Sequence, residues 1–224
     1  GELAAKGLPD GYLLLIAASS EVSLNAVIFA KMPYDPVKAF TPLTLATITP
    51  TILATHPSLP AKSVKEYIAL AASRPGQLSY ASVGTGSPQH FAGELLKLMA
   101  KINLIHVPFK GAGPAIIDLL GGHVPSGFVA LLPVIPHIKA GKLRGLAVSS
   151  AKRSPSLPEV SSLAESGFPG FDIVQWFSAW APAGTPKEIV DKVAADMIEI
   201  IKSPDYQKRM VEQGSGSIIF VSSN

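Results

Sequence analysis

The 224-residue chain contains no cysteine, and only 16% of its residues are charged. Without cysteine there is no disulfide framework, no thiolate catalysis and no cysteine metal site. The cellular compartment stays open, because exported proteins can also lack cysteine. Hydrophobic residues make up 47% of the chain, which is typical of a globular protein with a substantial core and excludes a disordered chain.

Long apolar runs and concentrated charge are missing as well. The longest apolar run, residues 128–138, is interrupted by Pro133 and Pro136 and falls short of the roughly 18 residues of a membrane span. The net charge of +3 is spread along the chain, and its basic pairs are not interleaved with aromatic residues as in a nucleic-acid groove. We expect neither a membrane-spanning segment nor a nucleic-acid partner.

The motifs of several enzyme classes are absent. The chain has no Walker P-loop and no G-x-S-x-G elbow, and Gln89 stands where a dinucleotide fingerprint needs its third small residue. No carboxylate pair stands out, and none of the five histidines has the H-x-x-x-H or H-E-x-x-H spacing of a metal site. We therefore expect no catalytic residue, no cofactor and no metal.

The most informative segment is a strand, a turn and a helix over residues 78–100. Residues 78–81 predict a short buried strand, and residues 82–87 a turn of small residues. Ser87 is a good N-cap and Pro88 a good first helical residue. Backbone N–H groups and the helix dipole would meet there and hold a carboxylate or phosphate, unless the turn is a tight connection that binds nothing. The expected apolar stripe of the helix is Phe91, Leu95, Leu98 and Ile102.

A second turn repeats this pattern. Residues 104–107 predict a strand, residues 109–113 a turn of small residues, and Pro114 the first residue of a helix that ends at Gly121. Two helix N-termini that follow neighbouring parallel strands share one rim of a sheet, which strengthens the case for an anion site. Lys110 either adds a positive charge to that rim or is simply solvated.

The rest of the chain alternates strands and helices, which predicts an α/β fold with mostly parallel sheets. Residues 12–18 predict a buried strand, and Ser19 and Ser20 at its end either contact a ligand or cap a helix over residues 21–29. Trp176, Phe177 and Trp180 are expected in core or hinge packing more than in a stacking platform. Further strands are expected over residues 43–48 and 51–56, with a break at Pro50 between them, and over residues 124–129, 143–148, 172–180 and 218–221. Further helices are expected over residues 133–140, 160–166 and 203–213. Two capping boxes begin helices: Ser63–Glu66 a helix to residue 72, and Thr185–Glu188 a helix to residue 201.

Several segments are specific in combination and extend over nearly the whole chain. They are Asp10-Gly11-Tyr12, Pro33-Tyr34-Asp35-Pro36, Pro57-Ser58-Leu59-Pro60, Tyr80-Ala81-Ser82 with Gly84 and Gly86-Ser87, His106-Val107-Pro108-Phe109-Lys110-Gly111, Asp118-Leu119-Leu120-Gly121-Gly122, Pro136-His137-Ile138-Lys139-Ala140-Gly141 and Ala181-Pro182-Ala183-Gly184-Thr185-Pro186. On these segments the chain resembles the tripartite tricarboxylate transporter substrate-binding family, the Bug-type or TctC-like receptors.

The resemblance implies a two-domain, type II periplasmic-binding-protein fold with two hinge crossings. Domain 1 would comprise residues 1–49 and 173–224, and domain 2 residues 50–172. The family's first strand and its Pro/Gly-rich loop would precede Gly1, so domain 1 is expected to be incomplete.

The resemblance also implies a ligand site, in which backbone N–H groups, hydroxyls and waters hold the carboxylates. Val129 stands where the family often carries an aspartate that would suit an amino group, which argues against an amino-acid ligand. Pro125 also stands where an aspartate is common. The implied contacts are Ser82, Gly84, Gly86, Ser87, Phe109, Lys110 and Gly111 from domain 2, with Ser19 and Ser20 from domain 1 and Val129 beside them.

The function implied is an extracytoplasmic receptor, exported to the periplasm, which captures a small carboxylate in the cleft between its domains. Di- and tricarboxylates and aromatic acids are the expected ligands, the subunits of a membrane permease the expected partners, and a monomer the expected state. Two alternatives stay open: a receptor that reports its ligand to a signalling partner, and an α/β enzyme that acts on an anionic substrate.

Overall fold

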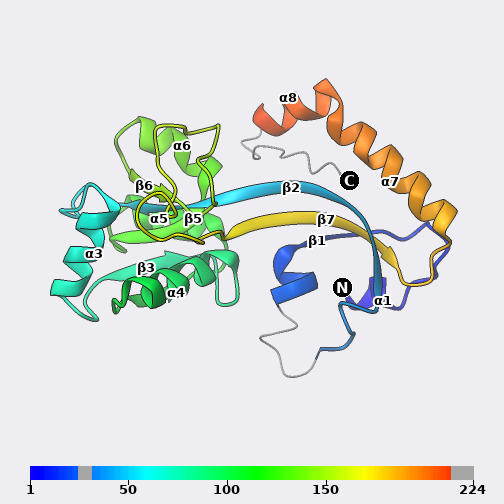
Figure 1. The fold of residues 1–224 in the computed structure, drawn as a ribbon, viewed down its shortest axis with the longest axis horizontal. Coiled ribbons are helices and arrows are strands. Elements are labelled where there is room, and N and C mark those ends of the chain that lie inside the picture. Colours follow the sequence, from blue (N-terminus) through cyan, green and yellow to red (C-terminus); the bar gives the residue numbers. More distant parts are fainter. Residues whose placement is uncertain (25–31, 213–224) are drawn as a thin grey trace. The chain divides into compact units, whose positions relative to one another are not determined.

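The computed structural model describes residues 1–24 and 32–212. The chain divides into two compact units, residues 1–48 with 175–224 and residues 49–174, which are described separately; their assignment to the two expected domains stays a prediction. The elements (Figure 1) are α1 (Glu2–Ala5), β1 (Leu15–Ala18), η1 (Ser20–Leu24), β2 (Phe40–Thr55), α3 (Val64–Ser73), β3 (Ser79–Ser82), α4 (Pro88–Ala100), β4 (Ile105–Pro108), α5 (Ala112–Leu120), β5 (Ser126–Ala130), α6 (Leu131–Lys139), β6 (Arg144–Val148), β7 (Val174–Pro182), α7 (Lys187–Lys202) and α8 (Pro204–Glu212). No helix in this described part is long and apolar enough to cross a membrane.

The sheet of the second unit is mixed. Strand β3 pairs in parallel with β4 on one side and β5 on the other. The C-terminal part of β2 pairs antiparallel with both β5 and β6. The α/β fold is therefore as predicted, but the expectation of mostly parallel sheets is correct only for β4, β3 and β5.

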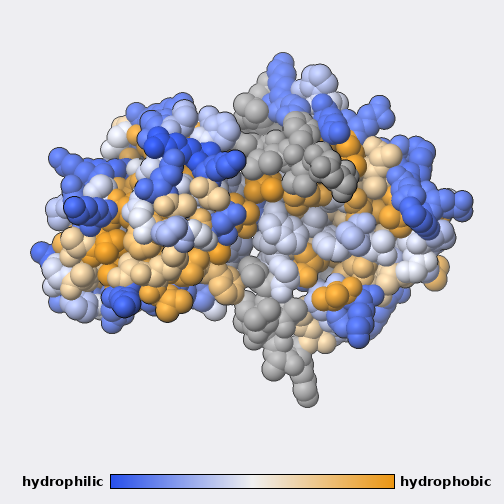
Figure 2. Space-filling view, in the orientation of Figure 1, coloured by the Kyte–Doolittle hydropathy of each residue, from blue (hydrophilic) through white to orange (hydrophobic). Residues whose placement is uncertain are grey.

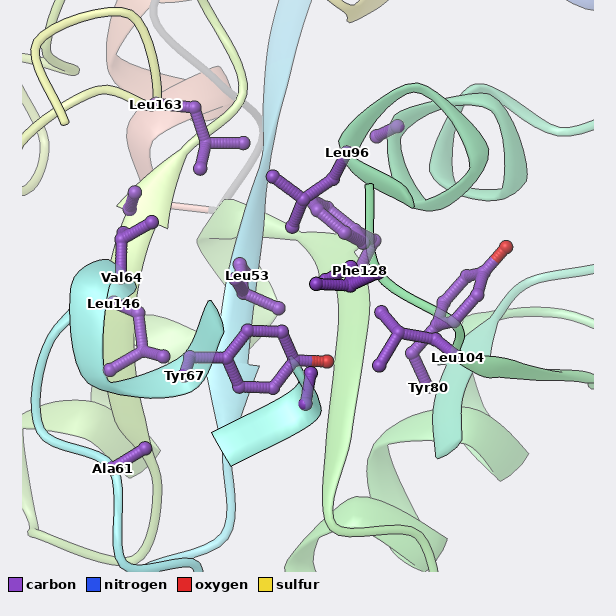
Figure 3. Close-up of a cluster of buried hydrophobic side chains, with 14 of the residues drawn as sticks. Leu53, Ala61, Val64, Tyr67, Tyr80, Leu96, Leu104, Phe128, Leu146 and Leu163 are labelled. Carbon is purple, nitrogen blue, oxygen red and sulfur yellow. The ribbon is translucent and has the colours of Figure 1, made fainter. Parts of the chain in front are cut away.

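Helices cover both faces of this sheet, because successive strand residues point to opposite sides. Leu53, Tyr80 and Phe128 lie on one face and pack under α3 and α4 (Figure 3). The neighbouring residues Ile52 and Val129 lie on the other face and pack with buried residues of α5 and α6. The sheet is thus buried on both sides, which fixes its register and the place where each strand ends.

The predicted apolar stripe of α4 is correct only in part: Ile102, just after the helix, is buried in the core, and Leu95 packs against it. Ala92, Gly93 and Leu96 face the core, whereas Leu98 is 75% exposed, and apolar residues lie on the surface over α4 (Figure 2). Gly93 adjoins Tyr80, whose ring occupies the space where any side chain on Gly93 would stand, 2.1 Å from an added Cβ. The helix therefore carries glycine where it approaches Tyr80, while Ala92 and Leu96 are fully buried beside it.

In the first unit, β7 lies between β1 and β2. Strand β1 is antiparallel to β7 and forms the edge. The buried strand predicted over residues 12–18 is therefore wrong: the strand begins at Leu15, and Tyr12 and Ile16 are 94% and 57% exposed. Of the helix expected over residues 21–29, the described residues form a short π-helical turn, and residues 25–31 lie outside the described part.

Strand β2 runs unbroken through Pro50, contrary to the predicted interruption. Proline lacks only a backbone donor, and Pro50 stands just before the residue, Thr51, at which pairing with β5 begins. Pro125 stands one residue before β5, at the entry to a strand that lies between β2 and β3. The strand expected over residues 218–221 lies outside the described residues.

Two expected features, a helix over residues 160–166 and the Thr185–Glu188 capping box, are absent. Residues 160–166 form turns, although the Ser162 hydroxyl accepts from the Glu165 N–H and the Glu165 carboxylate from the Ser162 N–H, as in a capping box. The Thr185 capping box does not form, because the Thr185 hydroxyl donates to the Pro182 carbonyl and α7 has no side-chain cap. The Ser63 cap of α3 is confirmed by the hydrogen bond from the Glu66 N–H.

A buried hydroxyl ties three segments of the second unit together. The Ser149 Oγ accepts from the Thr51 N–H at 3.1 Å and donates to the Ile173 carbonyl at 2.5 Å. Both Ser149 and Thr51 are fully buried, so water cannot replace these bonds without rearrangement.

We expect Ser149→Ala to lower the free energy of unfolding by about 1–3 kcal/mol, because it leaves a buried N–H and a buried carbonyl without a partner. Urea denaturation measures the change. Ser73→Ala, at an exposed helix end, is the control, with an expected change within about 0.5 kcal/mol. Equal effects of the two substitutions would contradict the structural role of Ser149.

Candidate functional site

The first loop of the predicted site joins β3 to α4. Ser87 caps the helix: its Oγ accepts from the His90 N–H at 3.2 Å and donates to the Gly84 carbonyl at 2.6 Å. Gly84 and Gly86 have φ of +137° and +81°, a backbone conformation that side chains disfavour. The predicted turn, cap and first helical residue, Pro88, are therefore all confirmed.

The second loop joins β4 to α5. Gly111, at a φ of +107°, precedes the helix, which begins at Ala112 and not at the predicted Pro114. Proline is tolerated at the third helical position because the first N–H groups of a helix have no partner within it. The helix therefore presents the N–H groups of Ala112 and Gly113 at its open end.

The two loops are bonded to each other. The Phe109 N–H donates to the Ser82 carbonyl at 3.0 Å, and the Gly111 N–H donates to the Val83 carbonyl at 3.2 Å. Gly84 is also close to the second loop, since a Cβ added to it would lie 3.4 Å from the Phe109 carbonyl oxygen. The parallel pairing of β3 with β4 thus brings the N-termini of α4 and α5 to one rim, as predicted.

The two helix ends differ in the donors they leave available. On α4, Pro88 has no N–H, the His90 N–H is bonded to Ser87, and the Gly86 N–H donates to the His90 Nδ1 at 3.2 Å. On α5 no side chain caps the helix, and among the described residues the N–H groups of Ala112 and Gly113 have no acceptor. An anion would therefore find its donors at α5 more than at α4.

Sequence reasoning centred on Ser87 missed Ala112 and Gly113. The available signal was the absence of a capping side chain at Gly111, together with a second glycine before Pro114. Space around the α5 end is open, because a Cβ added to Gly111 or to Gly113 would meet no atom within 4 Å.

Four of the predicted contact residues differ in how far their side chains are exposed near the rim. Ser82 is fully buried, and its Oγ lies 2.7 Å from the His106 Nε2 and accepts from the Gly84 N–H, so it supports the loop from below. Phe109 is half-buried against the core, whereas Lys110 is exposed and leaves its charge in solvent beside the rim. Val129 lies near the carboxyl end of β5 with its side chain fully buried among apolar residues, and its part in binding stays a prediction.

Ser19 and Ser20 belong to the first unit, and their part in binding stays a prediction. Ser19 is buried, and its hydroxyl has no hydrogen-bond partner among the described residues. Ser20 begins the π-helical turn. On β7, Trp176 and Trp180 are only half-buried and line an apolar hollow of about 330 Å³ with residues of β2, so the expected core packing of these side chains is incomplete.

Three stacked aromatic side chains lie below the first loop. The His106 ring stacks on Tyr80 at 5.0 Å and on His90 at 4.2 Å between ring centroids. The Tyr80 hydroxyl donates to Glu94, which also pairs with Lys97. Burial, reinforced by the neighbouring His90, lowers the pKa of His106 to about 4, so His106 is neutral at ordinary pH.

A rim of main-chain donors between two strand–helix loops is the arrangement of a protein that binds a small anion. The comparisons with known proteins agree with this class. Residues 2–220 match the family described as "Tripartite tricarboxylate transporter family receptor". The chain therefore belongs to this family, which is a family of receptors and not of enzymes.

One curated relative is Protein BugT of Bordetella pertussis, which is 33% identical over 216 residues, or 96% of this chain and 66% of BugT. A second, from Pseudomonas sp. strain P51, is described as "UPF0065 protein in tcbD-tcbE intergenic region" and is 33% identical over 95% of this chain and 63% of its own length. The chain thus spans about two thirds of the length of these relatives.

Several solved structures with a similar fold are 30% identical or more to this chain. Rpa4515 of R. palustris, solved with adipate, is 33% identical with a TM-score of 0.78, over 96% of this chain and 78% of Rpa4515. MatC from Rhodopseudomonas palustris, with bound malate, is 30% identical with a TM-score of 0.81, over 95% and 72%. The periplasmic binding protein BugD is 30% identical with a TM-score of 0.82, over 97% and 72%.

The fit of Gly93 against Tyr80 holds α4 close to the sheet below the first loop. We expect Gly93→Ala to lower the free energy of unfolding by about 1–3 kcal/mol, because overpacking outweighs the gain in helix propensity. Chemical denaturation measures this change. Gly113→Ala, in open space on α5, is the matched control and is expected to leave stability unchanged or slightly raised; destabilisation by both substitutions would show that glycine flexibility, not Tyr80, is the cause.

Proposed function

We propose that this chain binds a small carboxylate with the main-chain N–H groups at the start of α5, as part of an extracytoplasmic solute receptor. The observation that supports the proposal is the pair of N–H groups on Ala112 and Gly113, which lack an acceptor among the described residues and lie next to the open space around Gly111 and Gly113. Donors fixed on a helix and aimed along its dipole stabilise a negative charge without prior reorganisation.

The ligand class follows from the same groups. Backbone donors recognise a carboxylate, whereas they offer nothing to a cation. Adipate and malate are bound by two related proteins of similar fold, which supports a di- or tricarboxylate or an aromatic acid as the ligand here. The exposed Lys110 adds favourable but screened charge near the rim.

The proposal also covers the cellular location of the receptor and the partner that receives its ligand. The family is named for a tripartite tricarboxylate transporter, and BugD is a periplasmic binding protein. We place the whole receptor in the periplasm, as a monomer that carries the carboxylate to the subunits of a membrane permease.

Ala112→Pro tests the donor directly. Proline suits the first position of a helix, and Gly111 before it is already extended (ψ 178°), so the fold is expected to persist while one N–H is lost. A hydrogen bond to a charged group contributes about 1.5–3 kcal/mol, so we expect Kd for the carboxylate to rise about 10- to 100-fold.

Isothermal titration calorimetry with adipate and malate measures this effect. Ala112→Ser keeps the N–H and is the matched control, with an unchanged Kd as the expected result. Binding of neither acid to the unsubstituted protein would contradict the ligand class, and equal affinity in Ala112→Pro would exclude the α5 donor.

A further inference from the structure

His90 holds a donor that the anion site would otherwise offer. The Gly86 N–H in the β3–α4 loop donates to the His90 Nδ1 at 3.2 Å. A ring nitrogen that accepts this bond carries no proton, so neutral His90 has its proton on Nε2. Once protonated, the imidazole has two N–H groups and can no longer accept from Gly86.

We propose that the His90 imidazole competes with a bound carboxylate for the Gly86 N–H, so that protonation of His90 opens this loop to the ligand. The inference rests on the proposed function of the rim and adds that carboxylate binding there is coupled to protonation of His90. It makes His90 a positioning residue: the side chain holds the loop donor in the ligand-free protein and releases it when charged.

Four titratable groups lie beside His90 on the elements packed against it. On β4, His106 stacks on it at 4.2 Å and stays neutral, because burial lowers its pKa to about 4. On β3, the Tyr80 hydroxyl is neutral, since burial and the Glu94 hydrogen bond raise the pKa of the phenol. On α4 itself, Glu94 and Lys97 form an ion pair, and the Glu94 carboxylate is the group that would offset a charge on His90.

The position of His90 couples its proton to an anion. It is the third residue of α4, near the positive end of the helix dipole, where a cation is disfavoured. The negative charge of a carboxylate at the rim would offset this unfavourable interaction between a cationic His90 and the helix dipole. Anion binding and proton uptake would then assist each other, as thermodynamic linkage requires. An imidazole changes charge between about pH 5 and 8, a range in which a carboxylate with an ordinary pKa of about 4 is mostly ionised.

Nuclear magnetic resonance of the ligand-free protein tests the first step. Between pH 8 and 5.5, the Gly86 amide resonance is expected to move together with the His90 imidazole. The movement should disappear in His90→Phe, which keeps an aromatic ring but has no acceptor, and in His90→Gln, whose amide cannot change charge in this range. The control His123→Gln removes an exposed histidine and should retain it; a Gly86 amide that stays still while His90 titrates would overturn the proposal.

Calorimetric titration with adipate and malate over the same pH range tests the second step. We expect binding about tenfold tighter at pH 5.5 than at pH 8, which corresponds to one charge-assisted hydrogen bond, and no such dependence in either His90 variant. If the affinity does not change with pH, or if its pH dependence persists in His90→Phe and His90→Gln, the competition between His90 and the ligand is rejected while the proposed function stands. Failure of both acids to bind at every pH would reject the proposed function and the competition with it.

Discussion

The hydrogen bonds between the two loops are the constraint on which the candidate site depends. Phe109 and Gly111 donate to the carbonyls of Ser82 and Val83, which extends the parallel pairing of β3 and β4 beyond the ends of both strands. These bonds fix the start of α5 relative to the start of α4. Without them, each helix end would be an isolated N-terminus, and two such ends do not make a site.

The core below the loops supplies the rigidity that this arrangement needs. Tyr80 of β3 is fully buried and joins this strand to α4 and β4. It packs against Gly93 and donates to Glu94, both on α4, and it stacks on His106 of β4. Ser82, two residues further along β3, bonds to His106 and accepts from the Gly84 N–H. The β3–α4 loop of the candidate site is therefore held by buried side chains beneath it, and such support sets a binding geometry in advance of binding.

The sequence was sufficient for features that depend on local chemistry. The Ser63 and Ser87 caps, the glycine-rich turns and the order of strands and helices from β2 to β6 follow from neighbouring residues, and the structure confirms them. The buried face of α4 depends in part on Tyr80, a partner from another element, so the periodicity of apolar residues is correct for Leu95 and Ile102 but not for the exposed Leu98. The same applies to β1, whose apolar residues lie on an edge strand that the chain's hydropathy cannot identify as one.

The site was predictable in place but not in detail. Strand–turn–helix spacing located the rim, and the residues around Ser87 and Gly111 are indeed bonded together. Which donors are occupied could not be foreseen, because His90 and Ser87 satisfy those of α4 through side-chain rotamers that the sequence does not specify. Val129 was assigned by position in a family pattern, whereas its place on the sheet puts it in the core.

The proposed recognition by the start of α5 would have a consequence for how such a receptor changes over evolutionary time. Every residue other than proline carries the same amide, so ordinary point substitutions at Ala112 and Gly113 alter the shape of the surroundings while the attraction for negative charge persists. A lineage can therefore diversify the acids it collects by exchanging the residues that border the rim, while its preference for acids as a class is inherited through the fold itself.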